Sequence, residues 1–151
     1  MTSSCTYLYV HLVWSTKYRR PMIDEALALQ IPRLLVAKTR ELGCIPLAVM
    51  CMPEHVHMAV RTRGSVSPAL LVGQLKGLSA FRVNQARLRS GLRGRFGWQE
   101  GYGAFSFDGR DAAHVVRYIR EQETRHAAPR RVPPPGDPCW AREPEDFEPA
   151  M

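Results

Sequence analysis

The chain has 151 residues, enough for one hydrophobic core but too few for two domains with a cleft between them. It carries 21 Lys and Arg against 14 Asp and Glu, and this net charge of +7 favours a polyanionic partner such as nucleic acid. Three of these basic and five of these acidic residues lie in 127–151, which leaves 18 basic and nine acidic side chains in 1–126. The positive charge therefore belongs to the part that is expected to fold.

The cysteines and the hydropathy of the chain exclude two further classes of protein. Four cysteines without a CxxC pair are too sparse for a disulfide scaffold and suit a reducing compartment. No apolar run is long enough to span a bilayer, and the N-terminus does not have the pattern of a signal peptide. We therefore expect a cytoplasmic protein that does not bind membranes.

The first predicted element is a strand over residues 6–15, where one face is fully apolar at a period of two. A basic turn at 17–21 then leads to a helix that Asp24 could cap and Gly43 could end. Pro32 inside this stretch predicts a kink or a second helix start.

Two short apolar runs, 44–52 and 55–61, are separated only by Pro53 and Glu54, which predicts a pair of adjacent antiparallel strands. The stretch from Ser67 to about Arg89 predicts an amphipathic helix with a basic polar face.

A glycine-rich segment follows and predicts a mobile loop that ends in a short strand at 104–107. Asp108 or Asp111 is then expected to cap a last helix that runs to about His126.

The order of these elements predicts an α+β fold, with a ferredoxin-like antiparallel sheet and helices packed on one face. Residues 1–126 would form this single domain. Residues 127–151 are rich in proline and predict a C-terminal tail without a packed helix or strand along its length.

The tripeptide His55-Val56-His57 is the most informative local motif. On a strand, residues i and i+2 point to the same face roughly 6.5–7 Å apart, so both imidazoles can reach one metal ion. Two histidines that are merely hydrogen-bonded or exposed would give the same pattern.

The last predicted helix carries polar residues at intervals of four, namely His114, Tyr118, Gln122 and His126, which therefore share one side of the helix. By itself this stripe is also compatible with packing and solvation.

Four ordered segments carry a resemblance to a known family: YVHLVWSTKYRRP at 9–21, VMCMPEHVHMAV at 49–60, QLKGLSAFRVN at 74–84 and WQEGYGAFSFDGRDAAHVVRYIREQETRH at 98–126. Together they closely resemble the single-tyrosine HUH transposases of bacterial insertion sequences, including the REP-associated tyrosine transposases. The resemblance implies the HUH endonuclease fold. It also implies cleavage and rejoining of single-stranded DNA through a 5′-phosphotyrosine intermediate.

The resemblance assigns roles to four residues. Tyr118 would be the nucleophile, and His55, His57 and Gln122 would bind a divalent metal ion, Mg²⁺ or Mn²⁺. It further implies hairpin ends of single-stranded DNA as substrate and a homodimer that could exchange its last helix. The glycine-rich stretch 91–103 could act as the hinge for that exchange.

Basic residues in the same segments are candidates for phosphate contacts, although a solvated basic face would show the same charges. These candidates are Lys17, Arg19, Arg20, Lys76 and Arg82. Four aromatic residues could stack bases or belong to the core: Trp98, Tyr102, Phe105 and Phe107.

The chain departs from the family pattern at two places near the motifs. Glu54 replaces the usual Asp before the first histidine, and Glu121 replaces the usual Asn before Gln122.

Two alternatives for the function stay open: a resident nuclease that processes repeated palindromic sequences, and a non-catalytic nucleic-acid-binding ferredoxin-like module.

Overall fold

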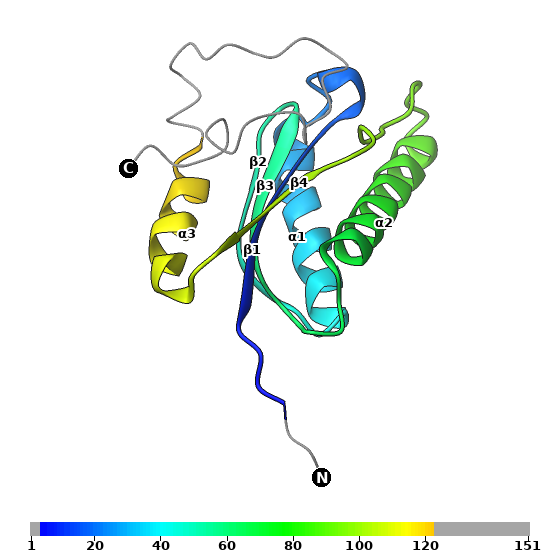
Figure 1. Cartoon of the computed structure of the whole chain (residues 1–151). Helices are drawn as coiled ribbons and strands as arrows, with labels where there is room; N and C mark the ends of the chain where they lie inside the picture. Colours follow the sequence, from blue (N-terminus) through cyan, green and yellow to red (C-terminus); the bar gives the residue numbers. More distant parts are fainter. Residues whose placement is uncertain (1–3, 123–151) are drawn as a thin grey trace.

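The computed structural model describes residues 4–122, which form a four-stranded antiparallel sheet with three α-helices (Figure 1). The strands are β1 (Leu8–Ser15), β2 (Ile45–Cys51), β3 (His55–Thr62) and β4 (Gly103–Phe107). The helices are α1 (Glu25–Glu41), α2 (Pro68–Arg89) and α3 (Ala112–Arg120), with short 3₁₀ turns η1 (Lys17–Arg19) and η2 (Gly109–Asp111).

The strand order β2-β3-β1-β4 confirms the ferredoxin-like α+β architecture. The hairpin of β2 and β3 forms as predicted, because Pro53 and Glu54 leave only a tight turn closed by the Met52 N–H and the His55 carbonyl. β1 lies in the centre of the sheet between β3 and β4. The strand β3, which carries the His-x-His motif, is therefore hydrogen-bonded to the central strand β1.

Side-chain hydrogen bonds begin two of the helices where the sequence predicts them. The Asp24 carboxylate accepts from the Leu27 N–H at 2.8 Å, and the Ser67 hydroxyl accepts from the Leu70 N–H at 3.1 Å. α1 is one helix that includes Pro32, so no second helix starts there. The last predicted helix is described only as far as Gln122, and His126 and the predicted tail lie outside the described residues.

The expectation that the helices share one face holds for α1 and α2, whereas α3 lies on the opposite face of the sheet (Figure 1). The physical reason is that β3 carries apolar side chains on both faces: Met58 packs under α1 and α2, and Ala59 packs under α3. Both helical layers therefore find apolar surface to bury.

The glycine-rich segment before β4, which the sequence predicts to be a mobile loop, is held by hydrogen bonds along its second half. The Asn84 side chain bonds both the N–H and the carbonyl of Phe96, and the Gln99 N–H donates to the Ser15 carbonyl. These backbone groups are thereby satisfied without a regular ladder. Among residues 4–122, no helix has the length and apolar character needed to cross a bilayer.

Candidate active site

β3 carries His55 and His57 on the face of the sheet that α3 covers. Val56 between them is fully buried in the larger core on the other face, as the alternation of side chains along a strand requires. His57 lies opposite Val13 of β1, and both imidazoles are only 5% exposed. The motif is therefore built into the centre of the sheet and does not lie on a surface loop.

The two imidazoles point toward each other. Nε2 of His55 lies 3.1 Å from Nε2 of His57. Two nitrogen ligands at about 2.1 Å from one metal ion and roughly at right angles are separated by about 3 Å. The spacing and the chemistry of this pair thus fit a shared metal ion.

Each imidazole is held at its other ring nitrogen. Oε1 of Glu54 lies 3.0 Å from Nδ1 of His55, and Nε2 of His11 lies 3.0 Å from Nδ1 of His57. A hydrogen on Nδ1 leaves the Nε2 lone pair available, which is the form in which a histidine binds metal. Glu54 and His11 therefore orient the two candidate ligands.

His11 is a residue of the site that sequence reasoning missed. Burial lowers its pKa to about 4, so its ring is uncharged at neutral pH and can accept the Nδ1 hydrogen of His57. The signal in the sequence was its place on the polar face of the first strand. Only the pairing of β1 with β3 shows that this face meets His57.

Tyr118 of α3 lies over the same group of rings. Its ring centroid is 6.1 Å from that of His57 and 6.0 Å from that of His11, and both contacts are edge-to-face. Val115 and Ile119 on the same helix pack against Ala59 and Ala48 of the sheet. This small apolar cluster fixes the helix face that carries the tyrosine.

Gln122 lies one turn after Tyr118 and is only 1% exposed, with its amide nitrogen donating to the Tyr118 carbonyl at 3.0 Å. Its amide oxygen is the atom that could join the two imidazoles as a metal ligand. Within residues 4–122, no cluster of three His, Cys, Asp or Glu side chains that could hold a metal ion is present, so a site here would depend on Gln122 as the third ligand. His114 is exposed, so the polar stripe predicted for this helix does not enter the site at that end.

A single chain brings Tyr118 to its own histidines, because α3 packs on β2 and β3 of the same sheet. The proposed hinge at 91–103 lies before β4, and β4 is paired with β1. A pivot there would have to pull β4 out of the sheet. An exchange of α3 alone would instead have to turn at η2 (Gly109–Asp111).

The structure separates the basic candidates into groups. Lys17 and Arg20 line a groove beside α2, and Arg82 is exposed on that helix. Nε and Nη1 of Arg19 are buried without a hydrogen-bond partner among the described residues. Lys76 donates to the carbonyls of Gln99 and Gly101 and so holds the segment before β4.

The aromatic candidates near β4 pack mainly against protein. Trp98 and Tyr102 join the larger core, and Phe107 joins the smaller one. The Phe105 ring meets His11 edge-on at 6.5 Å between centroids. Cys51 also fits a packing role, because burial raises the pKa of its thiol to about 12 and keeps it protonated.

This arrangement of sheet, paired histidines and facing tyrosine agrees with the family comparison. Residues 4–122 match the family described as Transposase IS200 like. The chain therefore belongs to this family, the single-tyrosine HUH transposases that its motifs resemble.

Individual relatives point the same way. The ISDra2 transposase TnpA of Deinococcus radiodurans is 27% identical over 120 residues, which cover 78% of this chain and 86% of the relative. A candidate transposase from D. radiodurans R1 superimposes with a TM-score of 0.64 at 25% identity, covering 81% of this chain and 95% of that one. A REP-associated tyrosine transposase bound to a REP hairpin shares the fold, with a TM-score of 0.58 at 17% identity, covering 83% of this chain and 74% of that one.

Proposed function

We propose that this transposase is a metal-dependent endonuclease and strand transferase that acts on single-stranded DNA through a covalent bond to Tyr118. The observation that carries the proposal is the meeting of Tyr118 with two imidazoles whose Nε2 atoms face each other at 3.1 Å. A packing or DNA-binding surface needs no such pair of facing imidazoles beside a tyrosine.

His55, His57 and Gln122 would hold the metal ion, and Mg²⁺ or Mn²⁺ suits a mixed set of nitrogen and oxygen ligands in a cell. Bound there, the ion would polarise the scissile phosphate and stabilise the charge of the transition state. Glu54 and His11 would keep both imidazoles in the ligating form, since each lies 3.0 Å from an Nδ1 atom.

The covalent step is a transesterification at phosphorus. The Tyr118 hydroxyl oxygen forms a bond to the phosphorus and loses its proton, while the bond to the 3′ oxygen breaks and that oxygen gains a proton. The products are a 5′-phosphotyrosine and a free 3′-hydroxyl. Because one phosphoester replaces another, attack by a 3′-hydroxyl can reverse the step and join strands without ATP.

Tyr118 is only 2% exposed, so a phosphate cannot meet its hydroxyl unless neighbouring parts move. α3 is nine residues long and rests on the smaller apolar cluster, and short helices depend on such packing for their stability. We therefore expect DNA binding to shift α3 relative to β3.

DNA binding is supported by charge and by one structural neighbour. Residues 1–126 have twice as many basic as acidic side chains, and the REP-associated relative was solved with a hairpin. Lys17, Arg19, Arg20 and Arg82 are the proposed phosphate contacts. A phosphate that reached Nε and Nη1 of Arg19 would satisfy these two buried atoms, since a buried donor without an acceptor is costly. Lys76 would contribute to DNA binding indirectly, by holding the segment before β4 in place.

The direct test of the proposed reaction is formation of a protein–DNA adduct. Wild-type protein is incubated with Mg²⁺ and single-stranded DNA from the ends of its own locus, and the products are separated on a denaturing gel. Tyr118→Phe should keep its fold and DNA binding and form no adduct, because only the nucleophilic oxygen is removed. Tyr102→Phe is the matched control and should form it normally. An adduct of normal yield from Tyr118→Phe would move the nucleophile elsewhere.

A homodimer is the proposed assembly, and its sites are composite only if α3 crosses between chains. Mixing His57→Ala with Tyr118→Phe under conditions that exchange subunits distinguishes the two cases. Composite sites would give one intact site in each heterodimer, and the adduct would reappear. Because α3 packs on its own sheet here, we expect proven heterodimers to stay inactive.

The proposed organisation is a catalytic domain over residues 1–126 followed by a proline-rich tail at 127–151, in a cytoplasmic protein. A resident nuclease that processes repeated palindromes would use the same site, and the likeness to a REP-associated transposase keeps it as second candidate. Flanking hairpin ends at the locus indicate a mobile element, and scattered repeats indicate the resident form.

A further inference from the structure

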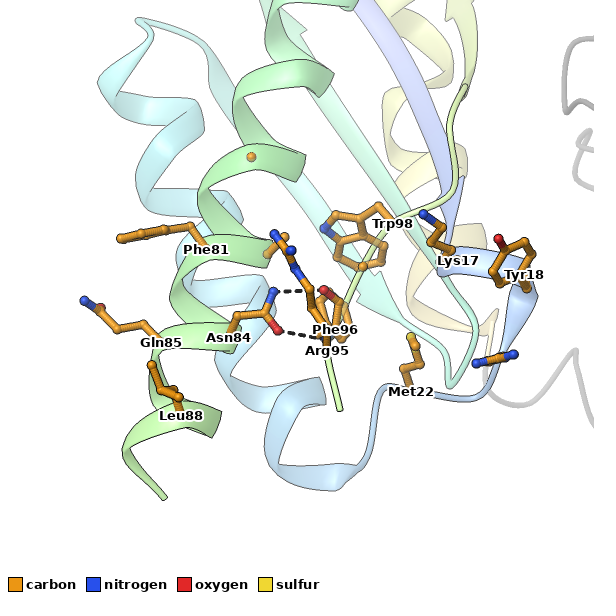
Figure 2. A pocket seen from close by; sticks show the side chains of 14 residues that line it. Lys17, Tyr18, Met22, Phe81, Asn84, Gln85, Leu88, Arg95, Phe96 and Trp98 are labelled. Carbon is orange, nitrogen blue, oxygen red and sulfur yellow. Dashed lines mark hydrogen bonds between the residues drawn. The ribbon is translucent and has the colours of Figure 1, made fainter. Parts of the chain in front are cut away.

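A large open groove lies on the α2 side of the sheet, away from Tyr118 and the paired histidines. Figure 2 shows Phe81, Gln85 and Leu88 of α2 on one rim and Lys17 and Tyr18 on the other, with Phe96 and Trp98 between them. Its volume is about 1010 Å³. Sites for drug-sized ligands hold about 300–1,000 Å³, so this groove has room for a short stretch of nucleotides.

The charge of the groove is of one sign. Lys17, Arg20 and Arg95 line it, and none of the described residues that line it is acidic. Nζ of Lys17 and Cζ of Arg20 lie 5.8 and 5.4 Å from the ring centroid of Tyr18. Positive charges beside an aromatic ring suit a ligand that carries both phosphates and flat bases.

Two aromatic rings at the groove are presented to solvent. Phe81 is 61% exposed and Tyr18 is 59% exposed, so neither contributes much to the core. Exposed apolar groups that gather at one hollow indicate a binding surface more often than isolated ones do. The faces of bases stack on such rings only when the bases are unpaired, because a duplex hides those faces.

The turn that presents Tyr18 has an unusual backbone. Tyr18 and Arg19 have φ values of 56° and 53°, in the left-handed region that residues other than glycine seldom adopt. Such conformations cost of order 1–3 kcal/mol each and persist only where the surroundings fix them. Strain of this kind is concentrated at functional sites.

Several hydrogen bonds hold that turn in place. The fully buried Thr16 hydroxyl lies 2.6 Å from the Arg20 carbonyl and 3.0 Å from the Glu54 carbonyl. The Tyr18 N–H donates to Oε1 of Gln99 at 3.0 Å, and the Lys17 N–H donates to the Gly97 carbonyl at 2.9 Å. One rim of the groove is therefore formed before any ligand arrives.

The floor of the groove is tied to α2 in the same way. The Asn84 side chain makes two hydrogen bonds to the backbone of Phe96, drawn as dashed lines in Figure 2. The Trp98 indole N–H donates to the Ser79 hydroxyl at 2.9 Å. A preformed site loses little conformational entropy when it binds its ligand.

From these observations we infer that the groove is a second DNA subsite, which binds unpaired nucleotides by stacking bases on Tyr18 and Phe81. Lys17, Arg20 and Arg95 neutralise the phosphates of the same stretch. The inference rests on the proposed function in one respect, namely that the ligand is single-stranded DNA. It places a binding site on the face of the sheet opposite the cleavage site.

The test is the affinity for a fluorescein-labelled 20-residue oligothymidylate without metal, measured by fluorescence anisotropy at fixed salt. Phe81→Leu and Tyr18→Leu should each weaken binding about 5- to 140-fold, the range that corresponds to about 1–3 kcal/mol of stacking. Phe81→Trp should restore it. Binding of a blunt duplex should change less than twofold.

Tyr7→Leu is the matched control, because Tyr7 is 62% exposed, does not line the groove and should bind as wild type. Phe81 lies on an exposed helix face, so its variant should keep the wild-type melting temperature even if Tyr18→Leu disturbs the strained turn.

Wild-type affinity of Phe81→Leu, a loss no larger than that of Tyr7→Leu, or an equal loss for the duplex would overturn the inference. A changed oligomeric mass with unchanged DNA affinity would assign the groove to a second copy and would also overturn it. If the wild-type adduct forms while the groove variants bind normally, only this inference fails. If the wild type forms no adduct, the proposed function fails.

Discussion

The two faces of the sheet are built differently. Under α1 and α2, sixteen buried residues of the described range 4–122 form one core that includes Trp14, Leu35 and Leu75. Under α3, the buried apolar cluster has five members, two of them alanines, and it lies beside His11, His55 and His57. The first face holds the fold together, and the second holds the polar groups.

This difference shows how a small domain can bury reactive groups without losing its stability. Burying an imidazole is tolerable only where hydrogen bonds compensate for lost water, and here Glu54 and His11 supply them to His55 and His57. The free energy that keeps the sheet folded comes mainly from the other face. Substitutions on one face of the sheet should therefore leave the structure of the other face largely unchanged.

The largest expected effect is on the α3 face. The His55→Ala, His57→Ala double variant should lose all detectable cleavage while its circular dichroism spectrum stays that of the wild type. EDTA should abolish wild-type cleavage in the same way, and Mg²⁺ or Mn²⁺ should restore it. Undiminished cutting in EDTA would rule out the metal assignment.

The second effect contrasts the two cores directly. Leu35→Ala, at a fully buried position under α1 and α2, should lower the free energy of unfolding by about 2–5 kcal/mol. Val115→Ala under α3 removes two methyl groups from a smaller cluster and should cost about 1–2 kcal/mol. Urea denaturation followed by tryptophan fluorescence measures both. Equal losses would show that both clusters contribute equally to the free energy of unfolding.

A third effect concerns the residues that orient the candidate ligands. His11→Ala and Glu54→Ala should each weaken Mn²⁺ binding about 10- to 100-fold, because an imidazole without its partner loses its fixed tautomer. Electron paramagnetic resonance of free Mn²⁺ gives the affinity without any cleavage. His114→Ala, on the exposed side of α3, should bind Mn²⁺ as the wild type does. Unchanged affinity in both variants would leave His11 and Glu54 as packing residues.

The smallest effect is one of local stability. Amide hydrogens of α3 should exchange faster than those of α2, since α3 has nine residues on a small cluster and α2 has 22 on the large core. Mass spectrometry of exchanged peptides gives the comparison. Slower exchange in α3 would contradict the expected movement of Tyr118 toward DNA.

Much of the fold could be predicted because its signals are local. The alternation in residues 6–15 and the caps Asp24 and Ser67 depend only on neighbours in the chain. The face on which α3 packs could not be predicted. That choice depends on Ala48 and Ala59, whose small side chains leave room for a helix only once the strands are paired.

The sequence by itself determined the family, through its four ordered segments. It also determined that His55 and His57 form a pair, because strand geometry alone puts residues i and i+2 on one face. It also placed Tyr118 and Gln122 one turn apart on one helix. Only the tertiary structure decided that His11 meets His57 and that the Lys17–Arg20 turn faces α2 across a groove. These contacts join residues 46 or more positions apart, and no local pattern records which distant strands and turns will meet.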